Sequence, residues 1–319
     1  MRPKLTGRVL FVFSDPGGAK PCLSLIEENE LQDVMPVSDR IYPFYSSFKT
    51  NVRYIDRGFE PLIEAFKPEL IFTGTSYTSD IEKQFIHIAK KRKIRCYSFV
   101  DHWTNISKRF EISDGIKDYP DKIWVIDERA AHIAIGEGID ETKIIISGNP
   151  YHTWLKKWKP QISKENFLKE IGLKDIKKKL LVYAPDPLSN VNGKEKYGFD
   201  ELSATYLLVE LFNEHQTELK DWKVLVKSHP NQNRKKLEKI LSNCKSIYIL
   251  PEDIDANSTI YFSDIVMGFF SSFLIEASVI GKPVLRVFSE QPKNDPFENL
   301  NVGMMVNLNS IIQVLHKII

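Results

Sequence analysis

The sequence predicts a two-domain α/β protein in which each domain is a doubly wound, mainly parallel sheet. At 319 residues the chain is longer than one hydrophobic core usually organises, and two domains of about 150 residues are expected. Short apolar runs alternate with helical segments in both halves, as in strand–helix–strand units with right-handed crossovers. A Lys- and Trp-rich stretch without a strand signal separates the halves. We therefore predict domains over residues 1–150 and 179–319, joined by a linker over 151–178.

The first half opens on an apolar run, residues 8–13 (RVLFVF), which predicts a buried strand that ends in the SDPGG turn. A helix is expected to start near Ala19. Residues 79–91 have helical apolar spacing. Four more runs predict strands: PELIFTG, IRCYSFV, DKIWVID and TKIIISG.

The second half repeats this pattern. Five runs predict strands, namely KLLVYAP, WKVLVKSHP, SIYILP, DIVMGFF and KPVLRVF. Helices are predicted for ELSATYLLVELFNEH, for the segment from Asn233 and for SFLIEASVIG. The last apolar segment, NSIIQVLHKII, predicts a helix that packs against the domain.

Composition excludes several classes of protein. Lys and Arg number 44 against 42 Asp and Glu, and this small basic excess argues against a dedicated nucleic-acid binder. Three distant cysteines without CxxC spacing suggest neither a zinc site nor disulfides, which fits a cytoplasmic protein. No apolar run reaches the ~20 residues of a spanning helix, so we expect a protein that is neither exported nor integral. The basic stretches 89–95 and 174–179 leave peripheral contact with the inner face of the membrane as an open alternative.

Ligands of open parallel sheets bind where strands end, since helix N-termini there present free N–H groups. The segment FFSSFLIEA places Ser271 and Ser272 at a helix start, which favours a phosphate. Glu276 lies on the same face as Ser272 and is positioned to accept hydrogen bonds from ribose hydroxyls. The alternative is an ordinary serine cap with a solvated glutamate.

His229 follows a predicted strand and precedes a proline that restrains the backbone. Its imidazole is suited to donate to a phosphate or to protonate a leaving phosphate oxygen, and Lys227 adds positive charge nearby. The alternative is a loop histidine without a role.

Three residues of the first half compete as the base that deprotonates an acceptor hydroxyl. Asp101 and His102 directly follow an apolar strand, and Asp15 lies in the first loop beside Gly17 and Gly18. These glycines let the backbone approach a ligand closely. The sequence does not rank the three. The glycine pair does not form the GxGxxG fingerprint, and no GxxxxGK[ST] motif is present.

An ordered set of motifs then resembles the GT-B enzymes. Gly148, Asn149 and Pro150 resemble the GNP element that closes the first domain of these enzymes, and VLVKSHPNQN is similar to their KxHP segment. The stretch SDIVMGFFSSFLIEASVIGKPVLRV resembles their strand, paired serines, helix with Glu-Ala, and GKPV. Bacterial polysaccharide glycosyltransferases, sialyltransferases, glycerophosphotransferases and UDP-N-acetylglucosamine 2-epimerases share this pattern.

The resemblance implies two Rossmann-like domains that face each other across a cleft and hold a nucleotide-activated sugar. It implies that His229, Ser271 and Ser272 contact the phosphates and Glu276 the ribose, with no cofactor and no essential metal. The expected reaction is inverting transfer from a CMP-, CDP- or UDP-linked donor to a hydroxyl of a glycan or lipid-linked acceptor. The epimerases carry a Gly-Gly pair and adjacent glutamates in the third motif, so the serines favour a transferase. A UDP-N-acetylglucosamine 2-epimerase-like enzyme and a non-catalytic nucleotide-sugar-binding protein are the alternatives.

Overall fold

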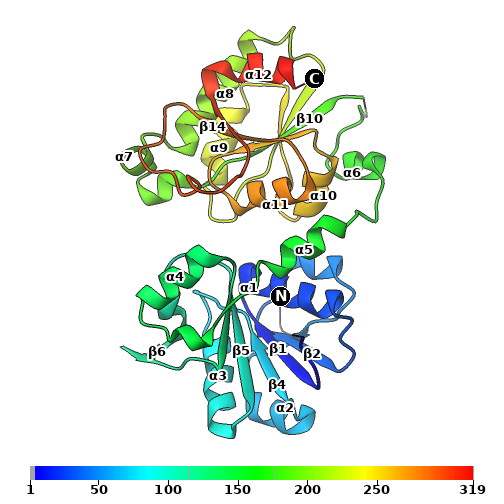
Figure 1. The fold of residues 1–319 in the computed structure, drawn as a ribbon. Helices are drawn as coiled ribbons and strands as arrows, with labels where there is room; N and C mark the ends of the chain where they lie inside the picture. The colour runs from blue at the N-terminus through cyan, green and yellow to red at the C-terminus, as the bar shows by residue number, and fades with distance from the viewer. Residues whose placement is uncertain (1–3, 114, 176, 319) are drawn as a thin grey trace. The chain divides into compact units, whose positions relative to one another are not determined.

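The computed structural model describes residues 4–113, 115–175 and 177–318. The chain forms two compact units, which meet in the sequence between Trp154 and Leu155. Each unit contains one main parallel sheet with helices packed against it (Figure 1). The predicted α/β class with two doubly wound sheets is therefore confirmed. In the described part of the chain, no helix is both long and apolar enough to cross a bilayer.

The division between the units falls inside helix α5 (Pro150–Lys157). The sequence predicts a linker over 151–178, whereas the second unit already begins at Leu155. Burial explains the difference, because Phe167 on helix α6 (Lys164–Glu170) is 0% exposed and belongs to the core of the second unit. A helix of seven residues with two apolar side chains is hard to see in a Lys-rich stretch.

The main sheet of the first unit is built from strands β1 (Val9–Phe13), β2 (Val34–Ser38), β3 (Arg53–Tyr54), β4 (Leu70–Thr73), β5 (Arg95–Val100), β8 (Lys122–Val125) and β9 (Ile144–Ile146). Their order is β3, β2, β1, β4, β5, β8, β9, and neighbouring strands are parallel. The direction of winding reverses between β1 and β4. A short antiparallel pair lies outside this sheet, β6 (Glu111–Ser113) with β7 (Ile116–Lys117).

Helices connect these strands. The α-helices of the first unit are α1 (Pro16–Glu28), α2 (Phe59–Phe66), α3 (Ile81–Arg92) and α4 (Glu128–Gly136). Short 3-10 turns cover η1 (Pro43–Ser47), η2 (Ser107–Phe110) and η3 (Glu141–Lys143). Helix α1 begins at Pro16, earlier than the predicted start near Ala19, because proline suits the first turn of a helix.

The sheet of the second unit contains β10 (Lys179–Ala184), β11 (Trp222–Val226), β12 (Ile247–Ile249), β13 (Ile265–Gly268), β14 (Val284–Phe288) and β15 (Met304–Asn307). All neighbours are parallel in the order β12, β11, β10, β13, β14, β15. The winding reverses between β10 and β13. This is the Rossmann strand order.

The remaining helices of this unit are α7 (Gly193–Tyr197), α8 (Glu201–Glu214), α9 (Arg234–Leu241), α10 (Ala256–Phe262), α11 (Ser272–Ile280) and α12 (Ile311–Lys317), with 3-10 turns η4 (Leu188–Val191) and η5 (Leu308–Ser310). Along β10, Leu181 and Tyr183 belong to one buried cluster, whereas Leu180 and Val182 belong to another. Both faces of the sheet are therefore covered, and this explains why the strands read as continuous apolar runs.

The start of α1 packs backbone against backbone on the end of β4. A Cβ added at Gly74 would lie 2.7 Å from the Cα of Gly18. We expect Gly74→Ala to lower the free energy of unfolding by about 1–3 kcal/mol, because neither backbone has room to move without disturbing the sheet. Urea titration measures this. Gly136→Ala is the control, since nothing lies within 4 Å of the added methyl group; equal stability of both variants would refute the packing argument.

Candidate functional site

The predicted binding residues of the second unit lie where its strand order reverses. Asp186 follows β10, His229 follows β11 and Ser271 follows β13, and these three strands are neighbours in the sheet. Where the connections that follow two neighbouring strands run in opposite directions, a crevice opens between them. Open α/β sheets bind their ligands in this crevice. These three loops are therefore the candidate ligand-binding segments of the second unit.

The helix that carries the predicted phosphate serines begins as expected. Ser271 is the N-cap of α11, and its Oγ accepts a hydrogen bond from the N–H of Phe273 at 3.2 Å. Ser272 is the first helical residue and is exposed. Gly268 lets β13 approach β10 closely, since a Cβ there would lie 2.5 Å from the carbonyl oxygen of Ala184. Ser271 thus serves as a cap, whereas Ser272 is exposed to solvent.

Glu276 lies one turn after Ser272 on α11. It is 7% exposed, which contradicts the alternative of a solvated surface carboxylate. Helical residues four apart share a face, so Ser272 and Glu276 can address the same ligand. The contact of Glu276 with a ribose stays a prediction.

Asp186 is absent from the residues predicted from the sequence, yet it contacts the segment before α11. Its Oδ2 accepts a hydrogen bond from the N–H of Phe270 at 2.9 Å. Burial raises the pKa of this carboxyl to about 6; the N–H groups of Phe270 and Ser271 oppose the shift, and the nearby Glu201 adds to it. The rule that selected the other segments, a polar residue directly after a predicted strand, also applies to the Asp186 that follows KLLVYAP.

The ring of His229 is held in one tautomer. Its Nδ1 accepts a hydrogen bond from the N–H of Asn231 at 3.1 Å, so the neutral ring carries its proton on Nε2. The backbone N–H of His229 donates to Oε1 of Gln232 at 3.1 Å. Partial desolvation lowers the pKa of His229 below its usual value near 6.5. At neutral pH the side chain is therefore an uncharged donor, which suits a hydrogen bond to phosphate better than proton transfer.

Lys227 is turned toward the neighbouring loop. Its Nζ donates to the carbonyl oxygen of Glu252 at 3.0 Å. Desolvation and then the positive charge of Arg234 lower the pKa of Lys227. The lysine is thus a partly engaged cation beside the predicted phosphate site.

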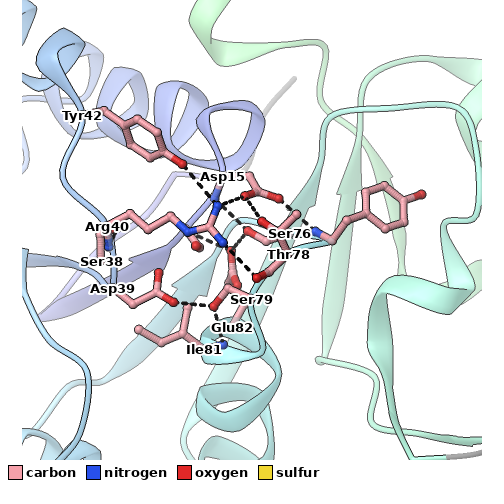
Figure 2. Close-up of polar contacts among 12 residues, drawn as sticks. Asp15, Ser38, Asp39, Arg40, Tyr42, Ser76, Thr78, Ser79, Ile81 and Glu82 are labelled. Carbon is pink, nitrogen blue, oxygen red and sulfur yellow. Dashed lines mark hydrogen bonds and ion pairs between the residues drawn. The ribbon is translucent and has the colours of Figure 1, made fainter. Parts of the chain in front are cut away.

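In the first unit, Asp15 joins three loops at the carboxyl edge of the sheet. Figure 2 shows its carboxylate between Arg40, which follows β2, and Thr78, which follows β4. Oδ1 accepts from Nη1 of Arg40 at 2.8 Å and from Oγ1 of Thr78 at 2.6 Å, and Oδ2 accepts from the N–H of Tyr77 at 2.9 Å. Both oxygens are engaged, so Asp15 acts as an anchor of these loops and is poorly placed to take a proton from a substrate.

A buried carboxyl group holds the backbone on which Asp15 lies. Glu82 on α3 is 2% exposed and accepts hydrogen bonds from the hydroxyl of Ser76 and the N–H of Ser14, and Ser76 in turn accepts the N–H of Asp15 (Figure 2). Burial raises the pKa of Glu82 to about 7, although these hydrogen bonds lower it. Within the described residues, Oε2 of Glu82 has no hydrogen-bond partner. The pair of Glu82 and Ser76 fixes the backbone that carries Asp15.

Asp101 is held by a buried cation. Nη1 of Arg109 donates to Oδ1 of Asp101 at 3.0 Å and to Oγ1 of Thr75 at 3.0 Å. The guanidinium lies 4.4 Å from the ring centre of Tyr77, and Arg109 is 6% exposed. The other oxygen of Asp101 faces Gly17, where a Cβ would come within 1.9 Å. Asp101 therefore keeps one oxygen outside the ion pair.

His102 is the least constrained of the three predicted bases. Its Nδ1 lies 3.0 Å from Oγ1 of Thr104. Desolvation lowers the pKa of His102, opposed by Asp101 and supported by the positive charges of Arg109 and Arg129. A neutral imidazole at physiological pH is suited to accept a proton.

Trp103, which directly follows His102, is held within the first unit. Its Nε1 donates to Oδ2 of Asp127 at 2.7 Å, and its ring packs against the core. Gly17 and Gly18, predicted to admit a ligand, face Asp101 and Gly74 respectively. Packing within the protein accounts for both glycines. In the described part of the chain, no group of three or more His, Cys, Asp or Glu side chains is placed to hold a metal ion.

No protein-family model matches this chain, and no curated protein matches it. Solved structures do match. UDP-GlcNAc 2-epimerase from Neisseria meningitidis, bound to UDP-GlcNAc, is similar with a TM-score of 0.66 and 16% identity, over 98% of this chain and 91% of that one. MnaA of S. aureus, solved with UDP, gives 0.66 and 14%, over 98% and 87%.

A third similar structure is the wall teichoic acid polymerase TagF, with a TM-score of 0.55 and 14% identity, over 97% of this chain and 79% of that one. At such identities the likeness establishes the fold. The order of strands in both units and these neighbours agree with the motifs of the second half. The chain therefore has the GT-B fold, built from two Rossmann-like units, that its motifs predict.

Proposed function

We propose that this chain is an enzyme that acts on a nucleotide-activated sugar. One observation carries the proposal: exposed Ser272 and buried Glu276 share a face of a helix that begins at the strand reversal, and His229 follows a strand of the same edge. Free N–H groups, a hydroxyl and an uncharged imidazole donor together suit a phosphate. A buried carboxylate one turn on suits sugar hydroxyls.

The donor that we propose first is UDP-linked. The sequence left CMP, CDP and UDP open. The neighbours solved with a bound nucleotide contain UDP or UDP-GlcNAc, which supports uridine over cytidine. As in the sequence prediction, the proposal includes no cofactor and no essential metal.

For the reaction, 2-epimerisation of a UDP-N-acetylamino sugar is the first candidate. The structural neighbours are mostly UDP-GlcNAc 2-epimerases, and they support this alternative better than the transferase that the motifs favoured. Inversion at C2 requires a base to remove the C2 proton as the C1–O bond to UDP breaks, and then re-addition of UDP at C1 while a proton is returned to the opposite face of C2. His102 and Asp101 are the residues of the first unit proposed for this proton transfer.

Inverting glycosyl transfer to a glycan or lipid-linked hydroxyl is the second candidate. The paired Ser271 and Ser272, in place of the glycines of the epimerases, favour it, and so does the likeness to TagF. Transfer needs only one base in the first unit, because the acceptor hydroxyl, once deprotonated by that base, attacks the anomeric carbon of the sugar directly. If the acceptor is lipid-linked, this second candidate function includes contact of the protein with the inner face of the membrane.

Nucleotide binding is tested first, by thermal shift with UDP, CMP, CDP and GDP. We expect UDP to stabilise the protein and His229→Ala to weaken its affinity about tenfold or more, since a hydrogen bond to a charged group contributes about 1.5–3 kcal/mol. His215→Ala is the control, because that ring pairs with Glu218 on the surface. If no nucleotide stabilises the protein, the proposal fails.

The reaction is tested by NMR on UDP-GlcNAc in deuterated water. An epimerase is expected to form the 2-epimer and to place deuterium at C2 without releasing UDP. A transferase leaves the sugar unchanged until an acceptor is added and then releases UDP. Binding without either change identifies a non-catalytic nucleotide-sugar-binding protein.

A further inference from the structure

The segment that leads into α11 already binds an anion that belongs to the protein itself. Oδ2 of Asp186 accepts the N–H of Phe270 at 2.9 Å, and the N–H of Ser271 also stabilises this carboxylate. These amides lie directly before α11, whose N-terminus the proposed function assigns to the donor phosphate. A phosphate oxygen and a carboxylate oxygen are both acceptors, so they compete for the same N–H groups.

The cations on neighbouring elements are engaged elsewhere: Arg286 on β14 bonds Asp295 and donates from Nε to the carbonyl oxygen of Phe269, and Nζ of Lys227 donates to the carbonyl oxygen of Glu252. Glu201 on α8, 1% exposed, is the titratable group that faces it from that helix, and Glu201 is itself held by the N–H and hydroxyl of Ser189 at 2.7 and 2.6 Å. From the strand side the neighbour is Tyr183, which is buried and uncharged. The segment before α11 contributes amides and no titratable group. A phosphate arriving here meets the negative charge of the ionised Asp186 carboxylate.

We propose that Asp186 is a specificity-determining residue, an internal anion that competes with the donor phosphate for the amides before α11. The inference rests on the proposed function and deepens it. A nucleotide binds there only when Asp186 releases the amides or loses its charge. The competition also disfavours the more highly charged ligand, so free UDP is repelled more than a UDP-sugar, which carries less charge on its terminal phosphate.

Because Asp186 competes as a carboxylate, the affinity for a nucleotide sugar is expected to depend on pH. Burial first, and then Glu201, raise the pKa of Asp186 to about 6. The group is a neutral acid below that value and a carboxylate above it, so affinity for a nucleotide sugar is expected to fall as the pH rises through 6.

The test is the variant Asp186→Asn, with UDP-GlcNAc as probe because its diphosphate diester does not titrate in this range. The Asn oxygen still accepts the N–H of Phe270, so the loop keeps its shape while the charge is removed. Calorimetry from about pH 5 to about pH 8 is expected to show binding at least about tenfold tighter at the upper end. That estimate follows because a like charge in close contact shifts an ionisation by about one to three pKa units. The pH dependence above 6 should also flatten, and free UDP should gain more than UDP-GlcNAc.

The matched control is Asp264→Asn. Oδ2 of Asp264 accepts the N–H of Leu180 at 2.8 Å, which is the same kind of bond at the other end of β10, and its affinity and pH profile should match the unmodified protein. Weaker or unchanged binding by Asp186→Asn overturns the inference, since Asp186 would then be a plain loop anchor. If the unmodified protein and both variants bind no nucleotide, the proposed function fails and this inference fails with it; binding by all three with equal affinity removes the inference alone.

Discussion

Replacing His102 with Ala is expected to lower kcat by about 10²–10⁴-fold, the usual contribution of a general base, while stability stays within about 0.5 kcal/mol. Asp15 is saturated by Arg40, Thr78 and the N–H of Tyr77, and Asp101 shares one oxygen with Arg109. The imidazole of His102 keeps Nε2 outside the hydrogen bonds of the described residues. It is therefore the readiest proton acceptor of the three predicted bases for either proposed reaction.

The pH profile separates a base from a structural histidine. Desolvation and the charges of Arg109 and Arg129 lower the pKa of His102 below its usual value near 6.5, against the opposite effect of Asp101. The neutral, basic form is present above this pKa, so kcat is expected to fall only as the pH drops below about 6.5. In His102→Gln this acidic limb should disappear along with most of the rate.

His132→Ala provides the comparison, because His132 is exposed and its Nδ1 is turned to the carbonyl oxygen of Glu128 within its own helix. Its kcat should equal that of the unmodified protein. Full activity of His102→Ala would assign the base to Asp101 or to a residue outside the predicted set. In that case Asp101→Asn becomes the decisive variant, with its stability measured in parallel, since it leaves buried Arg109 without a negative partner.

Most of the fold could be predicted because parallel strands buried on both faces read as apolar runs. RVLFVF and KLLVYAP became β1 and β10 within a residue, and β11 covers the first five residues of WKVLVKSHP. Strands without this signature were missed. Proline interrupts β2 at Pro36, and in β15 the side chains of Met304 and Met305 are about half exposed, 49% and 48%. An edge strand with exposed side chains has no apolar pattern to find.

For the candidate site, too, some features could be predicted from the sequence and others could not. Ser271 and Ser272 could be predicted because a helix start and its cap are local in sequence. The engagement of Asp15 could not, since Arg40 and Thr78 lie 25 and 63 residues away and meet it only through the sheet. The burial of Glu276 could not be predicted either. The sequence of α11 is apolar on most sides, so it does not separate a buried face from an exposed one.

The segment before α11 is also fixed from the other side by an ion pair. Arg286 on β14 is 3% exposed, bonds Asp295 through Nη2 and donates from Nε to the carbonyl oxygen of Phe269 at 3.3 Å. The rings of Phe270 and Phe297 lie 5.7 and 5.3 Å from its guanidinium carbon. Removing Arg286 would therefore leave the largely buried carboxylate of Asp295 without its cation.

Arg286→Met is therefore expected to lower the free energy of unfolding by about 3–5 kcal/mol, the usual cost of leaving one member of a buried ion pair alone. Denaturant titration of the whole chain measures it. In the double variant Arg286→Met/Asp295→Asn, the amide still accepts the N–H of Phe297 while the stranded charge is gone, so part of the loss should be recovered. Equal losses in the single and double variants would mean that packing of the aliphatic stem, and not the charge pair, stabilises this region. If the pair does fix Phe269, the single variant should also bind UDP more weakly under conditions where it remains folded, because the amides that follow Phe269 form the proposed phosphate loop.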